Sequence, residues 1–167
     1  LTEEAIEGYN TFAKVNPPLK TEKDRIAIIT GIADGTLDSI CTDHAPHAVE
    51  DKEVEFVNAR PGMVGLETAL GLIISQLIVT KKVSLIRALE AVTSAPAKVL
   101  RIQKGTLAIG SDADVIVVDP KKKWRVEPDQ FASRSRNTPF SGWELLGKVE
   151  TSVVGGSVVV ENAKLAV

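Results

Sequence analysis

The hydrophobic pattern of this chain changes near Gly105, and the change limits the architectures open to it. Before Gly105, apolar residues recur at helical spacing in several segments. After it, β-branched runs appear at Val115–Val118 and on both sides of Gly155-Gly156. Two such runs across a Gly-Gly pair indicate a hairpin with a two-residue turn. The sequence therefore predicts an α/β part over residues 1–104 and a mostly β part over 105–167.

A helix is expected between Thr21, which can cap it, and Gly35, which can end it. A shorter helix, capped by Thr2, is expected at the start of the chain. Residues 36–40 favour a turn and a short strand, with Asp43 at the C-terminal end of that strand. Barrel and α/β enzymes place reacting groups at that end of a strand. Asp43 is therefore the first candidate for a catalytic residue.

The longest apolar run lies within residues 63–79, where apolar side chains recur at i, i+4, i+7 and i+11 from Leu66. This spacing predicts a buried helix that packs on two sides. The run contains Glu67 and Gln76 and is shorter than the roughly 20 apolar residues that cross a bilayer. A membrane span is therefore not expected.

Two more short helices should follow, one capped by Ser84 and one opening at Ala95-Pro96. The first of them should pack through a stripe of Leu85, Leu89 and Val92. Residues 48–62 are polar and rich in turn formers, which favours a long loop beside the candidate site. The three lysines after Pro120, Lys121–Lys123, favour a solvated turn. Trp124 is expected to cover the edge of a core.

Composition narrows the classes of function. Of the 167 residues, 25% are charged and 44% apolar, and the net charge of -2 gives no electrostatic reason to expect nucleic acid or an anionic membrane as partner. A single cysteine excludes an internal disulfide framework and suits the cytoplasm. The first residue is Leu1 and the one methionine is Met63, so we expect that a segment was removed or that the chain is part of a longer polypeptide.

Both histidines of the chain lie within five residues of sequence, Asp43 to His47. Carboxylate and imidazole suit zinc, so Asp43 could bind a metal, but an Asp before a proline-bounded turn can equally bond its own backbone. On a regular strand, Asp43 and His44 would point to opposite faces. Two histidines cannot complete a mononuclear hydrolase site. Cys41 is more easily explained as a small buried hydrophobe than as a ligand.

Asn16 stands between Val15 and two prolines, which cannot form the interior of a helix. Its amide could bind a ligand from a rigid loop or simply form the turn. Composition alone leaves both interpretations open.

Several motifs, in this order along the chain, resemble the C-terminal part of the bacterial-type dihydroorotases. They are Lys14–Lys20, Thr42–His47, Arg60–Glu67 and Asn137–Phe140. Residues 105–114 are similar to a turn and strand that is widespread in the amidohydrolase superfamily. The resemblance covers essentially the whole chain.

The resemblance implies a fold and a reaction. The fold would be the C-terminal part of a (β/α)8 TIM-like metallo-hydrolase barrel over residues 1–104, followed over 105–167 by β-strands of a small β-sandwich, with a loop at about 129–147 returning toward the barrel. The reaction would be the zinc-dependent, reversible cyclisation of N-carbamoyl-aspartate to dihydroorotate in pyrimidine biosynthesis. One or two zinc ions would sit at the mouth of the barrel.

The resemblance also assigns roles to individual residues. Asp43 matches the aspartate of the last barrel strand that binds zinc and handles the proton of the attacking water. Asn16 and His47 match positions that hold the substrate, and the backbone at Pro61 and Gly62 matches a further contact. His44 matches no ligand and is expected to be structural.

The other metal ligands of the family, including a His-x-His pair, have no counterpart in this chain. We therefore expect a fragment that is inactive alone and that associates with the missing N-terminal part of the barrel, or as a homo-oligomer. Two alternatives remain. One is a hydantoinase, dihydropyrimidinase or allantoinase on the same scaffold, and the other is a non-catalytic subunit that assembles with aspartate transcarbamoylase.

Overall fold

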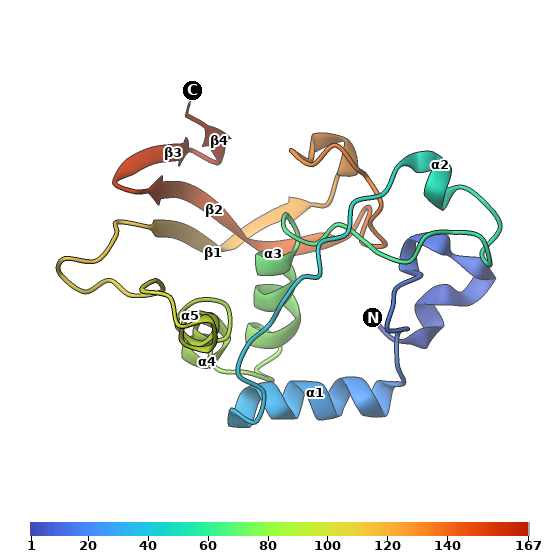
Figure 1. Ribbon diagram of the computed structural model, residues 1–167, viewed down its shortest axis with the longest axis horizontal. Coiled ribbons are helices and arrows are strands. Elements are labelled where there is room, and N and C mark those ends of the chain that lie inside the picture. Colours follow the sequence, from blue (N-terminus) through green and yellow to red (C-terminus); the bar gives the residue numbers. More distant parts are fainter. Residues whose placement is uncertain (167) are drawn as a thin grey trace. The chain divides into compact units, whose positions relative to one another are not determined.

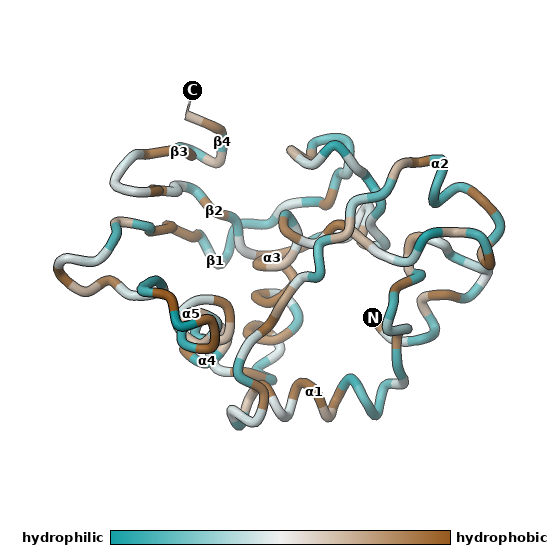
Figure 2. The backbone as a smooth tube through the Cα atoms, viewed as in Figure 1, coloured by the Kyte–Doolittle hydropathy of each residue, from teal (hydrophilic) through white to brown (hydrophobic). Residues whose placement is uncertain are grey.

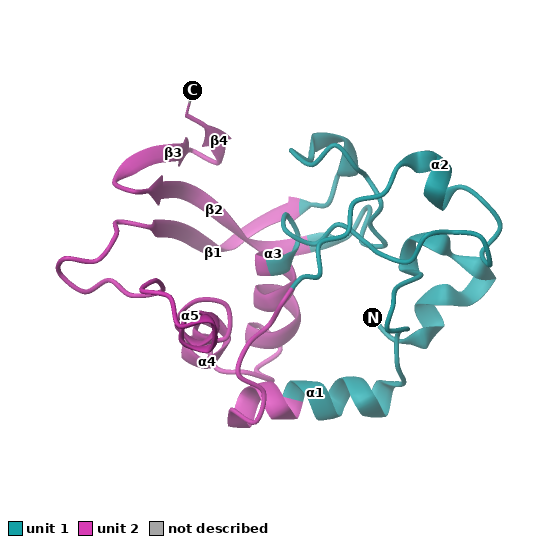
Figure 3. Ribbon diagram, viewed as in Figure 1, with its two compact units in different colours: residues 1–29, 42–69, 125–144 teal, residues 30–41, 70–124, 145–167 magenta. Residues whose placement is uncertain are grey.

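The structure is a computed structural model that describes residues 1–166, and it combines helices with one antiparallel sheet (Figure 1). The chain forms two compact units, each built from segments that are distant in sequence (Figure 3). The first unit contains Leu1–Ile29, Thr42–Ala69 and Arg125–Glu144. The second contains Thr30–Cys41, Leu70–Trp124 and Leu145–Val167. Every residue predicted to act in the site belongs to the first unit.

The N-terminal segment of the first unit is irregular. It forms short 3-10 turns at Glu3–Tyr9 and Thr11–Ala13. The predicted cap at Thr2 is wrong, because its side chain makes no capping hydrogen bond, and Gly8 adopts a φ of 69° that interrupts the helix. This unit also contains α2 (Val49–Lys52), a 3-10 turn at Pro128–Gln130, and the first part of α1 (Glu22–Asp34), up to Ile29.

Helix α1 (Glu22–Asp34) confirms the prediction for this part of the chain. The Thr21 hydroxyl accepts a hydrogen bond from the Asp24 amide and donates one to the Asp24 carboxylate, which itself accepts from the Thr21 amide. Such reciprocal bonds satisfy amides that have no partner within the helix. Gly35, with a φ of 86°, ends the helix.

The strand expected over residues 36–40 does not form. This segment has no regular secondary structure, and the nearest pairing is a single parallel bridge between His44 and Met63, supported by a 2.9 Å hydrogen bond from the Ala45 amide to the Met63 carbonyl. A strand exists only where a neighbour accepts its hydrogen bonds. Between residues 36 and 44, the structure of residues 1–166 provides such a pairing partner only at His44.

The helix predicted over 63–79 begins later, as α3 (Ala69–Ile73), and continues into a π-helical turn at Ile74–Ile78. Leu66 lies before it and is 66% exposed. Just before the helix, the Gly65 amide donates to the His44 ring, while the Gly65 carbonyl accepts from the Ala69 amide. Figure 2 shows that α3 is largely hydrophobic along its length. No helix among residues 1–166 is long and apolar enough to cross a membrane.

Helices α4 (Leu85–Glu90) and α5 (Ser94–Leu100) follow as predicted, and Ser84 caps α4 by accepting from the Arg87 amide at 3.2 Å. The predicted apolar stripe of α4 is wrong. Leu85 and Leu89 are exposed, and the small residues Ala88 and Ala91 are buried instead. Small side chains allow α4 to approach its neighbours in the second unit closely.

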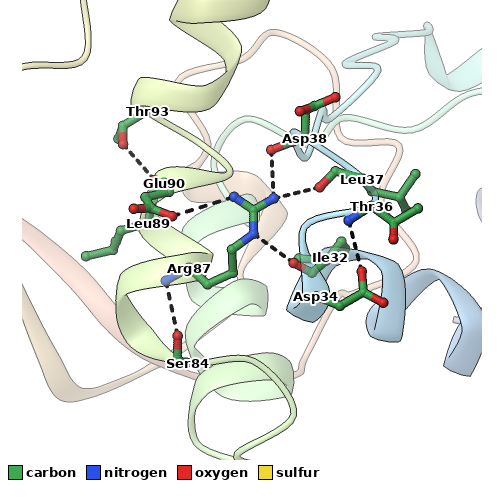
Figure 4. A network of polar contacts seen from close by, with 10 residues as sticks. All are labelled: Ile32, Asp34, Thr36, Leu37, Asp38, Ser84, Arg87, Leu89, Glu90 and Thr93. Atoms are coloured by element: carbon green, nitrogen blue, oxygen red, sulfur yellow. Dashed lines mark hydrogen bonds and ion pairs between the residues drawn. The ribbon is translucent and has the colours of Figure 1, made fainter.

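The Arg87 side chain of α4 ties this helix to the end of α1 (Figure 4). Its guanidinium donates to the carbonyls of Ile32, Leu37 and Asp38 at 2.8, 2.6 and 3.0 Å. Ile32 lies in the last turn of α1, whose carbonyls have no partner within the helix, and Leu37 and Asp38 lie beyond its end. An arginine has enough donors to bond all three. The contact orders the segment that follows α1.

The sheet has the order β1-β2-β3-β4, with β1 (Val115–Arg125), β2 (Glu144–Val154), β3 (Ser157–Glu161) and β4 (Lys164–Leu165). The predicted hairpin is confirmed, since Val154 pairs with Ser157 across Gly155-Gly156. The predicted turn at Lys121–Lys123 is wrong, because β1 continues through Pro120 to Arg125. Proline is tolerated there because β1 is an edge strand.

Helix α3 and strand β2 pack tightly in the second unit. A Cβ added to Gly147 would lie 2.2 Å from the Ile74 side chain, and one added to Gly71 would lie 3.0 Å from Leu145. The Trp124 indole donates to the Gly147 carbonyl at 2.9 Å, as expected for a residue at the edge of a core. Two glycines therefore permit the close approach of helix and strand.

Candidate active site

Asp43 is exposed and adopts a φ of 44°, in the left-handed region. The alternation of a regular strand therefore does not apply at Asp43. Within residues 1–166 its carboxylate makes no hydrogen bond or ion pair, so the expected alternative of a turn former bonded to its own backbone does not hold here. The free carboxylate is available to a metal ion, a proton or a ligand.

Three of the predicted substrate contacts lie against one another. The His47 ring nitrogen Nε2 is 3.0 Å from the Pro61 carbonyl oxygen. Because a carbonyl can only accept, Nε2 carries the proton and Nδ1 is the nitrogen left for another partner. Gly62 is buried with a φ of 139°, and a Cβ there would lie 2.8 Å from His47 Nε2 and 2.7 Å from the Ala45 side chain. Only glycine allows the backbone to pass this close to the imidazole.

Asn137 joins the His47 segment to the Gly62 segment. Its side chain is 2% exposed; Oδ1 accepts from the His47 amide at 3.1 Å, and Nδ2 donates to the carbonyls of Ala45 at 2.9 Å and Gly62 at 3.2 Å. Its own carbonyl accepts from the Val64 amide at 3.0 Å. The resemblance indicated the Asn137–Phe140 motif, but not a role for this carboxamide.

Lys52 was not predicted as part of the site. It lies in the polar stretch expected to be a loop, yet it is the last residue of α2 and its side chain is fully buried. Its ammonium donates to the carbonyls of Arg60 at 2.7 Å and Gly62 at 3.1 Å. Burial lowers the pKa of Lys52, and the charge of Lys14 lowers it further. The burial of Lys52 could not be predicted from the sequence. All four residues of Glu50–Glu53 are charged, and no sequence feature marks Lys52 as the buried one.

Asn16 is exposed, and its side chain makes no hydrogen bond within the described residues. Its loop is nevertheless fixed beside the other predicted contacts, because the Gly62 amide donates to the Lys14 carbonyl at 2.8 Å. The Lys14 ammonium in turn donates to the carbonyls of Phe56 and Val57 at 2.7 and 3.1 Å. The structure thus brings the Asn16 loop to the Gly62 backbone, without a direct contact from the amide.

The other two polar residues of the motif have separate environments. His44 Nδ1 accepts from the Gly65 and Leu66 amides at 3.1 and 3.4 Å, which is a structural use of the ring. Cys41 is exposed, so its interpretation as a buried hydrophobe is wrong. No group of three or more His, Cys, Asp and Glu side chains in residues 1–166 could hold a metal ion. The Asp43 carboxylate has the chemistry of one metal ligand, and residues 1–166 do not complete a set around it.

Enzymes named as dihydroorotases are similar to this chain along nearly its whole length. The dihydroorotase of Pelotomaculum thermopropionicum is 49% identical over 162 residues, which is 97% of this chain and 38% of that protein. The dihydroorotase of Geobacter metallireducens is 46% identical over 162 residues, again 97% of this chain and 38% of that protein. The chain therefore spans 38% of the length of these curated relatives.

Solved structures of cyclic amidases share the fold. The L-hydantoinase (dihydropyrimidinase) of Arthrobacter aurescens is similar with a TM-score of 0.94 and 32% identity, over 100% of this chain and 38% of that one. The dihydropyrimidinase of Brevibacillus agri, at 23% identity, shares the fold with a TM-score of 0.91 over 99% of this chain and 38% of its own. Residues 10–159 match the Amidohydrolase family. Since this match covers most of the sequence, the chain belongs to the Amidohydrolase family.

Proposed function

We propose that this chain is the C-terminal part of a dihydroorotase that cyclises N-carbamoyl-aspartate to dihydroorotate reversibly, with zinc. Residues 1–104 would form the last units of the (β/α)8 barrel and residues 105–167 the C-terminal share of the β-sandwich, with the loop at about 129–147 returning to the barrel. The complete protein would consist of this chain and the preceding barrel segments that carry the other metal ligands. It would act in the cytoplasm.

The observation that carries the proposal is the contact between His47 and the Pro61-Gly62 backbone. Nε2 of the ring is held by the Pro61 carbonyl at 3.0 Å, and Gly62 leaves room for the ring. These residues are remote in sequence, and the resemblance assigns the same role to both. Their contact is what one binding surface for a small substrate requires.

The residues of this chain would divide the work as follows. The free carboxylate of Asp43 would bind zinc, take the proton of the attacking water during ring opening and pass it to the leaving amide nitrogen, with the reverse transfers during ring closure. Bound zinc would polarise the scissile carbonyl and lower the pKa of water. The His47 ring and the Asn16 amide would hydrogen-bond the substrate carboxylate and ring amide. Backbone groups at Pro61 and Gly62 would complete the contact.

A panel of cyclic amides tests the substrate. The complete protein, loaded with zinc, would be assayed for hydrolysis of dihydroorotate, hydantoin, dihydrouracil and allantoin. We expect the highest kcat/KM with dihydroorotate, because the two dihydroorotases are 49% and 46% identical to this chain and the hydantoinase only 32%. Preferred hydrolysis of hydantoin, dihydrouracil or allantoin would instead establish the second candidate, a cyclic amidase of the hydantoinase type, which the TM-score of 0.94 with the hydantoinase favours.

The same assay separates an enzyme from a non-catalytic subunit. A complete protein that hydrolyses none of the four substrates, and that co-purifies with aspartate transcarbamoylase, would contradict the enzymatic proposal. We expect turnover, because Asp43, Asn16 and His47 are all present in this chain.

A further inference from the structure

We infer that Lys52 and Asn137 are positioning residues that set the Pro61-Gly62 backbone and the His47 segment in the geometry that binds substrate. The inference rests on the proposed function, because it assigns these two side chains to the binding surface proposed there. Neither side chain touches the substrate in this proposal. Each acts through the backbone groups it bonds.

The Gly62 carbonyl receives two donors from two distant segments. Lys52 Nζ donates to it at 3.1 Å and Asn137 Nδ2 at 3.2 Å. A carbonyl oxygen has two lone pairs, so both are used and its direction is fixed. This orients the peptide plane between Gly62 and Met63.

The two preceding peptide planes are held as well. Lys52 Nζ also donates to the Arg60 carbonyl at 2.7 Å, which orients the plane between Arg60 and Pro61. The next plane is held from both sides, because the Gly62 amide donates to Lys14 and the Pro61 carbonyl accepts from His47. Three consecutive peptide planes are therefore defined, and Lys52 bonds the first and the last.

Asn137 connects this backbone to the histidine. Its Oδ1 accepts from the His47 amide at 3.1 Å, and its Nδ2 bonds both the Ala45 and the Gly62 carbonyls. A planar carboxamide that makes all three bonds fixes the distance between the two segments. The position of the imidazole relative to Gly62 then follows.

The charge of Lys52 argues for a role beyond packing. Its ammonium is fully buried and, within residues 1–166, no carboxylate pairs with it. A buried charge without a counter-ion is costly, and an apolar side chain of similar length is often no worse for stability. A methionine in this place could not orient two carbonyls. The ammonium of Lys52 therefore serves to position the Arg60 and Gly62 carbonyls more than to stabilise the fold.

Steady-state kinetics of the complete, zinc-loaded protein test the inference. K52M and N137D each remove donors to the Gly62 carbonyl, and N137D keeps the acceptor for the His47 amide. We expect KM for dihydroorotate to rise about 10- to 100-fold in each, since misplacement of a binding group by about 1 Å costs up to a factor of about 100. K52R, which restores a donor, should recover part of this loss, and zinc content should stay at the wild-type value.

K122M is the control. It also removes an ammonium that has a partner, because Lys122 pairs with Glu150 in the second unit and makes no bond to the His47 or Gly62 segments within residues 1–166. We expect the KM of K122M to stay within about threefold of wild type. Equal effects of K122M and K52M, or an unchanged KM in both K52M and N137D, would overturn the inference, because a merely structural role lowers the melting temperature without changing KM.

Amide hydrogen exchange distinguishes failure of the inference from failure of the proposed function. In the complete protein we expect the Gly62 amide to exchange at least about tenfold faster in K52M, and the His47 amide likewise in N137A, with amides of α5 unchanged. A wild-type protein that turns over no substrate would contradict the proposed function. Unchanged exchange at Gly62 and His47 would overturn the positioning role whatever the activity.

Discussion

The carboxylate of Asp43 is exposed and has no partner within residues 1–166, so replacing it should affect chemistry and leave stability unchanged. We expect D43N in the complete protein to lower kcat/KM for dihydroorotate at least about 100-fold, because the proton acceptor is lost. The melting temperature of the metal-free protein should not change, because Asp43 has no partner within residues 1–166. D38N is the control, since Asp38 contributes only its backbone carbonyl to the Arg87 contact. A D43N variant with more than a tenth of wild-type activity would contradict the role of Asp43.

A second residue-scale prediction concerns Lys104, which lies 2.6 Å from Asp112 and 2.5 Å from Asp114. Hydrogen bonds to Asp112 and then Asp114 raise the pKa of Lys104 to about 12. Bonds from Lys104 and then from the Gly155 amide lower the pKa of Asp114. The contribution of the Asp114 carboxylate to folding stability is therefore complete above its ordinary pKa and is lost as pH falls through its lowered pKa. The contribution of the Lys104 ammonium is complete below its ordinary pKa and is lost as pH rises through about 12.

K104M tests this coupling. We expect the pKa of Asp114, followed by carboxyl carbon chemical shifts, to rise toward its ordinary value in K104M. K98M should leave it where it is, because Lys98 is exposed on α5. No rise in K104M would show that the Gly155 amide alone accounts for the low pKa.

Sequence could predict single residues only where the signal was local. Asp43, His44 and His47 could be identified as candidates because they lie within five consecutive positions. The roles of Lys52 and Asn137 could not be predicted, because they depend on carbonyls that these side chains reach only after folding. Asn137 bonds residues 90 and 92 positions away.

At the scale of elements, the packing of α3 against β2 depends on Gly147. We expect G147A to lower the free energy of unfolding of the complete protein by roughly 2 to 3 kcal/mol, since the new Cβ meets Ile74 and the φ of 88° disfavours alanine. G156A is the control: its φ is 83° and nothing lies within 4 Å of the added Cβ. It should therefore cost only the backbone term, about 1 kcal/mol. Urea unfolding measures both, and equal losses would exclude a clash with Ile74.

Some of the predicted helices and strands had a local sequence signal and were correct, and others depended on distant residues and were wrong. Helix α1, the Ser84 cap and the Gly155-Gly156 hairpin were correct because their signals lie within a few residues. The strand over 36–40 was wrong because a strand needs a partner. The end of β1 was wrong because Pro120 stops a central strand and not an edge one.

At the scale of the whole molecule, the isolated 167-residue chain should not act alone. In the proposed function Asp43 would supply one metal ligand, and residues 1–166 hold no group of three possible ligands. We expect the purified chain to bind no stoichiometric zinc and to hydrolyse no dihydroorotate, by metal analysis and by an activity assay. Stoichiometric zinc with activity near that of the complete protein would contradict the proposal that other ligands lie elsewhere.

The isolated chain should also associate. Leu66 and Leu107 are 66% and 80% exposed, and β1 is an open edge of the sheet. Exposed apolar side chains and unpaired edges favour assembly. Size-exclusion chromatography with light scattering should therefore show oligomers, or a complex once the N-terminal barrel segments are added. A stable monomer would contradict the prediction that the isolated chain associates.

The carboxamide of Asn137 also has a consequence for the order in which the protein matures. During synthesis, Asn16, Asp43, His47 and Gly62 emerge long before Asn137, and closing a loop of about 90 residues delays their final arrangement. A polypeptide that stops before Arg125 would contain every predicted substrate contact and still lack the group that joins two of them. Until Asn137 has been translated and folded into place, the His47 and Gly62 segments would therefore lack the side chain that joins them.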